Sequence, residues 1–124
     1  MEKIFTDKAP AAIGPYSQAM VIGNLVYTSG QIPINPKTNN IDASDIETQT
    51  EQVCKNLSAV LDAAGSSLES VIKTTCFLSD MADFAAFNSV YAKYFTGCPA
   101  RSCVAVKALP KGSLVEIEAI AEIK

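Results

Sequence analysis

Residues 114–123 read LVEIEAIAEI, and their alternation constrains how the rest of the chain packs. In a β-strand, successive side chains point to opposite faces of the sheet. One face of this segment is purely apolar and carries Val115, Ile117, Ala119, Ala121 and Ile123. The other face carries Glu116, Glu118 and Glu122 beside Leu114 and Ile120. The alternation predicts a strand whose apolar face is covered by helices and whose acidic face is not.

The segment Asp45–Ala64 is the first of two predicted helices. Ser44 followed by Glu47 is typical of a capping box at a helix start. Gly65 suits the position just after a helix end. Apolar residues recur at helical spacing at Ile46, Val53, Leu57, Val60, Leu61 and Ala64. One stripe of this helix is therefore expected to be buried.

A second helix is predicted to begin after Asp80 or Asp83 and to run to about Phe95. Its apolar stripe is aromatic and consists of Phe84, Phe87, Tyr91, Tyr94 and Phe95. The spacing is that of one helix face. We interpret this stripe as core packing rather than as a cofactor site.

The remaining apolar segments predict strands. Gly23-Asn24 between two apolar runs is typical of a two-residue hairpin turn. The expected strands are Lys3–Phe5, Ala19–Ile22, Leu25–Thr28, Val71–Leu78, Arg101–Leu109 and Leu114–Ile123. Together they predict a single α+β domain over residues 1–124, with two helices packed on one face of a sheet. The strands are apolar on more than one side, as Val71, Ile72, Phe77 and Leu78 illustrate, so the helices leave apolar surface uncovered, and we expect a partner subunit and hence an oligomer.

Composition narrows the possible functions. The chain has 124 residues and a net charge of −3, and this charge makes nucleic-acid binding an unlikely role. There is no His, which excludes imidazole as a metal ligand or as an acid/base group. No apolar run reaches the roughly 18 residues of a membrane span. The start MEKIFTDKAP does not resemble a signal peptide, and the four cysteines have no metal-site spacing, so a cytoplasmic protein with reduced thiols is expected.

Arg101 is the single arginine of the chain and the first candidate for binding an anion. Strand alternation places Arg101, Cys103 and Ala105 on one face. An arginine and carboxylates such as Glu116 around a cleft can hold an organic acid and activate water. From the residues alone, a structural ion pair between Arg101 and a glutamate is the simpler alternative.

Two further segments contain candidate pocket residues. Gly14-Pro15 predicts a turn that places Tyr16 just before a strand, where its hydroxyl lines either a pocket or a rim. Gly30, next to Ser29 at the end of a strand, is typical of a close backbone approach. Ser29 has no histidine to activate it, so an acyl-enzyme mechanism is not expected.

These segments together resemble one family. The similarity rests on GPYSQA at 14–19, SGQIP at 29–33, PARSCV at 99–104 and EIEA at 116–119. This set is similar to the RidA/YjgF family of enamine/imine deaminases, which are also labelled endoribonuclease L-PSP. The resemblance covers about Ile4 to Glu122. The stretch Phe95–Pro99 looks shorter than in familiar bacterial members, so a different cleft entrance is expected.

The resemblance implies a fold, an assembly and a reaction. The family fold is chorismate-mutase-like, with a mixed β-sheet and two helices packed on one face. Members are homotrimers with ligand clefts between subunits, and they use neither a metal nor an organic cofactor. Their substrates are 2-imino acids and enamines such as 2-aminoacrylate, which become 2-oxo acids and ammonia.

The family's motifs also assign roles to individual positions. Arg101 is expected to bind the substrate carboxylate, and Glu116 to hold the attacking water. Cys103 is expected to contact the substrate through its backbone and not as a nucleophile. The remaining matches are pocket positions, at Tyr16, Ser29 and Asn88.

Two alternatives to imine hydrolysis stay open. One is a single-stranded RNA endoribonuclease or translation inhibitor, which the older family label suggests. The acidic charge and the lack of basic runs interleaved with aromatics disfavour it. The other is a protein that binds 2-oxo acids without turnover or acts as a holdase.

Overall fold

The computed structural model describes all 124 residues as one six-stranded mixed sheet with two α-helices. The strands are β1 (Glu2–Ile4), β2 (Ala19–Ile22), β3 (Leu25–Thr28), β4 (Val71–Leu78), β5 (Ala100–Ala105) and β6 (Val115–Glu122). The helices are α1 (Ile46–Ala63) and α2 (Phe84–Tyr94). Three short 3₁₀ turns lie at Leu68–Ser70, Met81–Asp83 and Pro110–Gly112. Neither α-helix is both long and apolar enough to cross a lipid bilayer.

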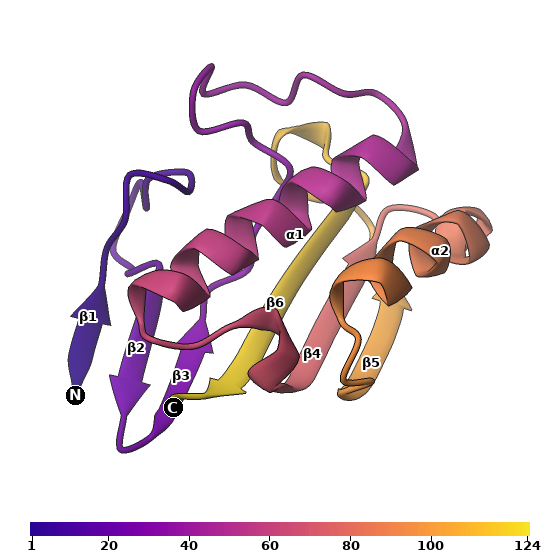
Figure 1. Cartoon of the computed structure of the whole chain (residues 1–124). Coiled ribbons are helices and arrows are strands. Elements are labelled where there is room, and N and C mark those ends of the chain that lie inside the picture. The colour runs from indigo at the N-terminus through magenta and orange to yellow at the C-terminus, as the bar shows by residue number, and fades with distance from the viewer.

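The strand order is β1-β2-β3-β6-β4-β5, and only the β4–β5 pair is parallel. Figure 1 shows both helices in front of the sheet, with no element behind it. The predicted α+β architecture is thus confirmed, including the cover on one face. The last strand of the chain lies in the middle of the sheet, between β3 and β4, and does not pair with β5.

The core lies between the helices and the predicted apolar face of β6. Val115, Ile117 and Ala121 are fully buried there. From α1 the fully buried side chains include Val53, Leu57, Val60 and Leu61. The aromatic stripe of α2 joins this core through Phe87, Tyr91 and Phe95, as predicted. Burial of these side chains is the main force that holds the two layers together.

The predicted cap of α1 and the predicted end of β5 are wrong, and β1 begins and ends one residue earlier than the expected Lys3–Phe5. The N-cap of α1 is Asp45, whose carboxylate accepts from the Thr48 amide at 2.8 Å, and not Ser44 with Glu47. An anionic cap is favoured at the positive end of the helix dipole. β5 ends at Ala105 rather than Leu109 because its only neighbour, β4, ends at Leu78, the partner of Ala105. An edge strand without a second neighbour has no ladder to continue.

Candidate functional site

The Arg101 side chain lies between β5 and α2. Nη1 of Arg101 donates to Oδ1 of Asn88 at 2.7 Å. Its guanidinium carbon lies 4.8 Å from the ring centroid of Tyr91, 5.5 Å from that of Phe84 and 6.0 Å from that of Phe87. A guanidinium at such distances is attracted by the electron-rich ring faces. The aromatic stripe of α2 therefore packs the core and also holds the one arginine.

The Tyr91 side chain is held in place by contacts with β4 and with its own helix. Its hydroxyl shares a 2.7 Å hydrogen bond with the hydroxyl of Thr74 on β4, and its ring stacks on Phe95 at 4.3 Å. Burial raises the pKa of Tyr91. The neutral phenol is thus locked under the guanidinium, which limits the directions that Arg101 can take.

An open groove of about 630 Å³ begins at this arginine. We call it the Arg101 groove, and it is lined by Asn88, Tyr91, Ala92, Phe95, Thr96, Cys98, Pro99 and Arg101. The hydrogen-bond partner of Arg101 is a neutral amide, so the structural ion pair with a glutamate is not formed. A half-buried, uncompensated guanidinium in a groove is suited to bind a carboxylate.

Cys103 lies two residues further along β5, on the same face as Arg101. Burial raises the pKa of its thiol, while the charge of Arg101 acts in the opposite direction and is the weaker cause. The thiol is therefore protonated at neutral pH. A protonated thiol is a poor nucleophile.

Glu116 lies in a second cluster, on β6. A β-carbon added to Gly30 would collide with the carboxylate of Glu116, so this side chain rests directly on the Gly30 backbone. Burial and, to a smaller degree, the neighbouring Glu118 raise the pKa of Glu116. The carboxylate is thus half-buried, and it is more basic than an ordinary glutamate.

The segment that carries Gly30 is held rigidly. Gln31 forms a two-way backbone bridge with Ile117, with N–O distances of 2.8 and 3.2 Å. The buried Asn56 of α1 donates to the carbonyl oxygens of Ile32 and Ile34 at 3.1 and 2.9 Å. These bonds hold the residues after Gly30 against β6 and α1, and so keep the Gly30 backbone next to Glu116.

Ser29 and Tyr16 belong to this second cluster. Oγ of Ser29 donates to the carbonyl of Ser17 at 2.6 Å, and Tyr16 shares a small cavity of about 70 Å³ with Gly30. Tyr16 is 54% exposed, so its ring projects from the chain. We call the group of Tyr16, Ser29, Gly30 and Glu116 the Glu116 half-site.

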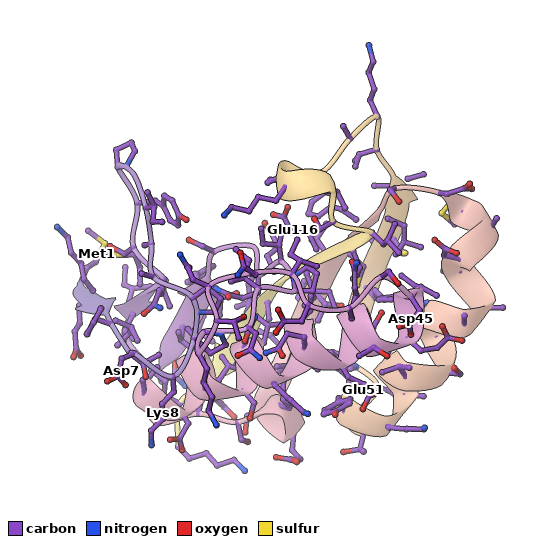
Figure 2. The ribbon with its side chains drawn as sticks, turned by 90° about the horizontal axis from the view of Figure 1, so that it is seen from above. Met1, Asp7, Lys8, Asp45, Glu51 and Glu116 are labelled. Atoms are coloured by element: carbon purple, nitrogen blue, oxygen red, sulfur yellow. The ribbon has the colours of Figure 1, made fainter.

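The two clusters lie on opposite faces of the sheet. Arg101 pairs with Thr74, whose side chain is buried on the helix-covered face. Glu116 pairs with Phe77, one step out of phase, and so points to the bare face. Figure 2 shows Glu116 on the side of the sheet away from α1. Within one chain, Arg101 and Glu116 therefore do not meet around one small molecule.

Known proteins match this chain over nearly all of its length. A family model described as Endoribonuclease L-PSP matches residues 6–123. The chain belongs to this family, also called RidA/YjgF. A RutC family protein of Pyrococcus horikoshii is 57% identical over 121 residues, which cover 97% of this chain and 96% of the relative.

Solved structures of RidA/YjgF proteins have the same fold. The Rid-family protein YyfA of Yersinia pestis superposes with a TM-score of 0.95 at 52% identity, over 98% of each chain. TdcF of E. coli, solved with bound serine, superposes with a TM-score of 0.95 at 44% identity over the full length of both chains. The predicted family and fold are thus confirmed.

Sequence reasoning missed part of the site. The spacing of the aromatic stripe predicts core packing alone, whereas Tyr91 and Phe95 also line the Arg101 groove. Ala92, which lines it too, is not among the predicted site residues, whereas Pro99 belongs to the stretch Phe95–Pro99 expected at the cleft entrance. Helical spacing contained a usable signal, because residues three, four and seven positions after Asn88 share its side of the helix.

Proposed function

We propose that this RidA/YjgF protein hydrolyses 2-imino acids and their enamine tautomers, such as 2-aminoacrylate, to 2-oxo acids and ammonia. The observation that supports this proposal most strongly is that the Arg101 side chain has no carboxylate partner. Its guanidinium lines a groove, and its hydrogen-bond partner is the neutral Asn88 amide. A guanidinium that is held in place without a carboxylate partner keeps its capacity for charge-assisted hydrogen bonds to a substrate acid.

For this reaction the protein needs mainly to orient the substrate and the attacking water. An enamine first takes a proton at its β-carbon and becomes the imine. Water then adds to the C=N carbon, and the C–N bond of the resulting amino alcohol breaks to release ammonia and leave the 2-oxo acid. Arg101 would bind the carboxylate, and Glu116, with its raised pKa, would hold the water and accept its proton. Orientation of this kind contributes several kcal/mol.

The serine in TdcF supports this substrate class. Serine has a carboxylate and a nitrogen on the adjacent carbon, and the proposed imino acids share both groups. At 44% identity over the whole chain, TdcF is similar enough for its ligand to guide the choice of substrate for this protein.

The site would be shared between subunits of a homotrimer. The opposite orientation of Arg101 and Glu116 supports this, since a neighbouring copy must supply whichever group is out of reach. The bare face also supports association, because it exposes large apolar side chains that include Ile72 and Tyr27.

The family description also names an endoribonuclease, which makes RNA cleavage the second candidate. A net charge of −3 and the absence of His disfavour it. RNA cleavage is therefore measured alongside imine hydrolysis in the experiments below.

The test generates 2-aminoacrylate from serine with a serine dehydratase and follows its disappearance. We expect Arg101→Ala to lower kcat/KM by about a hundredfold or more, since hydrogen bonds to charged groups contribute roughly 1.5–3 kcal/mol each. Lys93→Ala is the matched control, because it removes an exposed cation of α2 that does not line the groove. Equal rates for wild type and Arg101→Ala would contradict the proposal.

The shared site has its own test. Arg101→Ala and Glu116→Gln proteins are purified separately, unfolded together and refolded as mixed oligomers. If each site takes Arg101 from one chain and Glu116 from another, the mixture regains sites with both native groups, and activity returns. If both groups come from one chain, no mixture regains activity.

Two further measurements separate the alternatives. Cleavage of labelled single-stranded RNA that survives nuclease removal and disappears in Arg101→Ala would favour the endoribonuclease. Tight calorimetric binding of 2-oxobutyrate without imine hydrolysis would favour a binding protein that does not turn substrate over.

A further inference from the structure

Asn56 is a polar side chain on the buried side of α1. It is 1% exposed, and Val53 and Val60, which lie about one turn before and after it, are fully buried. An apolar side chain would fill such a position without a polar group to desolvate, whereas a buried amide needs hydrogen-bond partners. The reason for an amide at this position therefore lies in the groups that it binds.

The carboxamide of Asn56 has a partner for each of its groups. Its Nδ2 donates to the carbonyl oxygens of Ile32 and Ile34 at 3.1 and 2.9 Å, and its Oδ1 accepts from Nε2 of Gln52 at 2.9 Å. Because Nε2 of Gln52 can only donate, the oxygen of the Asn56 carboxamide must face Gln52 and both N–H groups must face the loop. Both donated hydrogen bonds thus go to the segment that follows Gly30.

That segment is a tight turn around Pro33. The amide of Ile34 donates to the carbonyl of Ile32 at 2.8 Å, so Pro33 is the central residue of a γ-turn. The proline ring fixes its own φ, and Ile34 is buried. Because the turn has so little freedom, a hydrogen bond to either end of it constrains the whole turn.

One backbone bridge connects the turn to the reacting carboxylate. The turn directly follows Gln31, which exchanges two backbone hydrogen bonds with Ile117 at 2.8 and 3.2 Å. Glu116 precedes Ile117, and Gly30, on which the carboxylate of Glu116 rests, precedes Gln31. Asn56, on a helix of the covered face, is therefore linked through the loop to a carboxylate on the bare face.

We infer that Asn56 is a positioning residue for imine hydrolysis, because it holds the Gly30 backbone against Glu116 through the turn at Pro33. This inference rests on the proposed function and adds to it a residue that binds neither the substrate nor the water. Without Asn56, two carbonyl groups of the turn lose a buried donor, and they can regain hydrogen bonds to water only if the turn moves away from α1. The Gly30 backbone moves with the turn, and Glu116 then loses the surface on which it rests.

Asn56→Leu tests the inference with a side chain of similar volume that donates no hydrogen bond. We expect kcat for 2-aminoacrylate to fall by about tenfold or more, since a shift of about 1 Å at a reacting group costs about a hundredfold and a smaller shift is expected here. KM should stay close to the wild-type value, because Arg101 on the other face of the sheet binds the carboxylate of the substrate.

Thr50→Val is the matched control for this substitution. Thr50 is also fully buried on α1, and its hydroxyl donates to the carbonyl of Ile46 in the same helix at 2.7 Å. The control removes a buried hydrogen bond of α1 but no bond to the loop. Its kcat should therefore match wild type even where urea denaturation shows a lower free energy of unfolding.

Coupling to Glu116 distinguishes positioning from a general loss of activity. In a Glu116→Gln background, Asn56→Leu should lower kcat little further, because the group that it positions has already lost its function. Amide hydrogen exchange reports on the bridge directly. The amides of Gln31 and Ile117 should exchange faster in Asn56→Leu than in wild type or in Thr50→Val.

The possible results lead to different conclusions. An unchanged kcat in folded Asn56→Leu, or a loss as large in the Glu116→Gln background as in wild type, overturns the inference and leaves the proposed function intact. If Asn56→Leu does not fold, Asn56→Ser, which can donate only one hydrogen bond, is tested against the same expectations. If wild type does not accelerate the hydrolysis of 2-aminoacrylate, the proposed function is overturned and this inference with it.

Discussion

The two faces of the sheet use the same strands but differ in every physical respect. On the covered face of β6, Val115 and Ile117 are fully buried under the helices. On the bare face, Glu116 and Glu118 alternate with them, and Ile72 of β4 is 50% exposed. The covered face completes the core within one chain. On the bare face, no helix of this chain covers the sheet, as Figure 1 shows.

The Arg101 groove and the Glu116 half-site also differ in the surroundings of their charged groups. Arg101 is held by an amide and by aromatic ring faces, which keep its charge available. Glu116 is half-buried and lies near Glu118, and both burial and this like charge raise its pKa. Under the proposed function, the Arg101 groove would bind the carboxylate of the substrate, and Glu116 would accept a proton from water.

Leu57→Ala gives the largest expected loss on the covered face. Leu57 is fully buried, and removal of its side chain leaves a cavity, so we expect about 2–5 kcal/mol lower free energy of unfolding. Ile72→Ala on the bare face should cost under about 1 kcal/mol in the isolated chain, as exposed positions usually do. Urea denaturation at two protein concentrations measures both.

Concentration distinguishes the two faces further. If the bare face is an interface, the cost of Ile72→Ala depends on protein concentration, because association stabilises the folded chain. The cost of Leu57→Ala does not change in this way. Equal losses that are independent of concentration at both positions would remove the contrast between the faces.

Gly30→Ala tests the Glu116 half-site alone. The new methyl group would displace the Glu116 carboxylate, and we expect about a hundredfold lower kcat/KM, as a shift of about 1 Å at a reacting group typically costs. Gly23→Ala is the control, because its left-handed φ of 58° makes the substitution strained but no atom is in the way.

A double mutant sharpens this prediction. In a Glu116→Gln background, Gly30→Ala should cost little more, since the group it displaces has already lost its function. Additive losses would mean that Gly30 acts through something other than Glu116.

Glu118→Gln gives the smallest expected effect, on the pH profile. Because the pKa of Glu116 is raised, its carboxylate is lost at a higher pH than an ordinary glutamate as the solution is acidified. Removal of the Glu118 charge lowers this pKa part of the way, since burial is the larger cause. The acid limb of kcat/KM therefore moves to lower pH.

Glu122→Gln is the matched control for this shift. Glu122 is on the same face of β6, further along the strand, and should leave the acid limb where it is in wild type. A shift to higher pH in Glu118→Gln would contradict the assignment of Glu116 as the titrating group.

Local sequence patterns predicted helices and strands well where neighbouring residues alone determine their bounds. The bounds of the hairpin strands and of Val71–Leu78 are confirmed residue by residue. The close approach expected at Gly30 is confirmed by Glu116 resting on it. The cap of α1 and the end of β5 were wrong, because a competing carboxylate and the length of a neighbouring strand decided them.

The sequence by itself determined that this chain forms a two-faced sheet with both helices on one side. It also determined that the single arginine lies in one of the last two strands of the chain. Alternation and helical spacing are properties of neighbouring residues, so they can be read in order along the chain. Only the tertiary structure decided that Arg101 lies on aromatic rings beside Asn88, and that Glu116 lies on the opposite face. These facts depend on which strands pair and in what register, and contacts between distant segments set both.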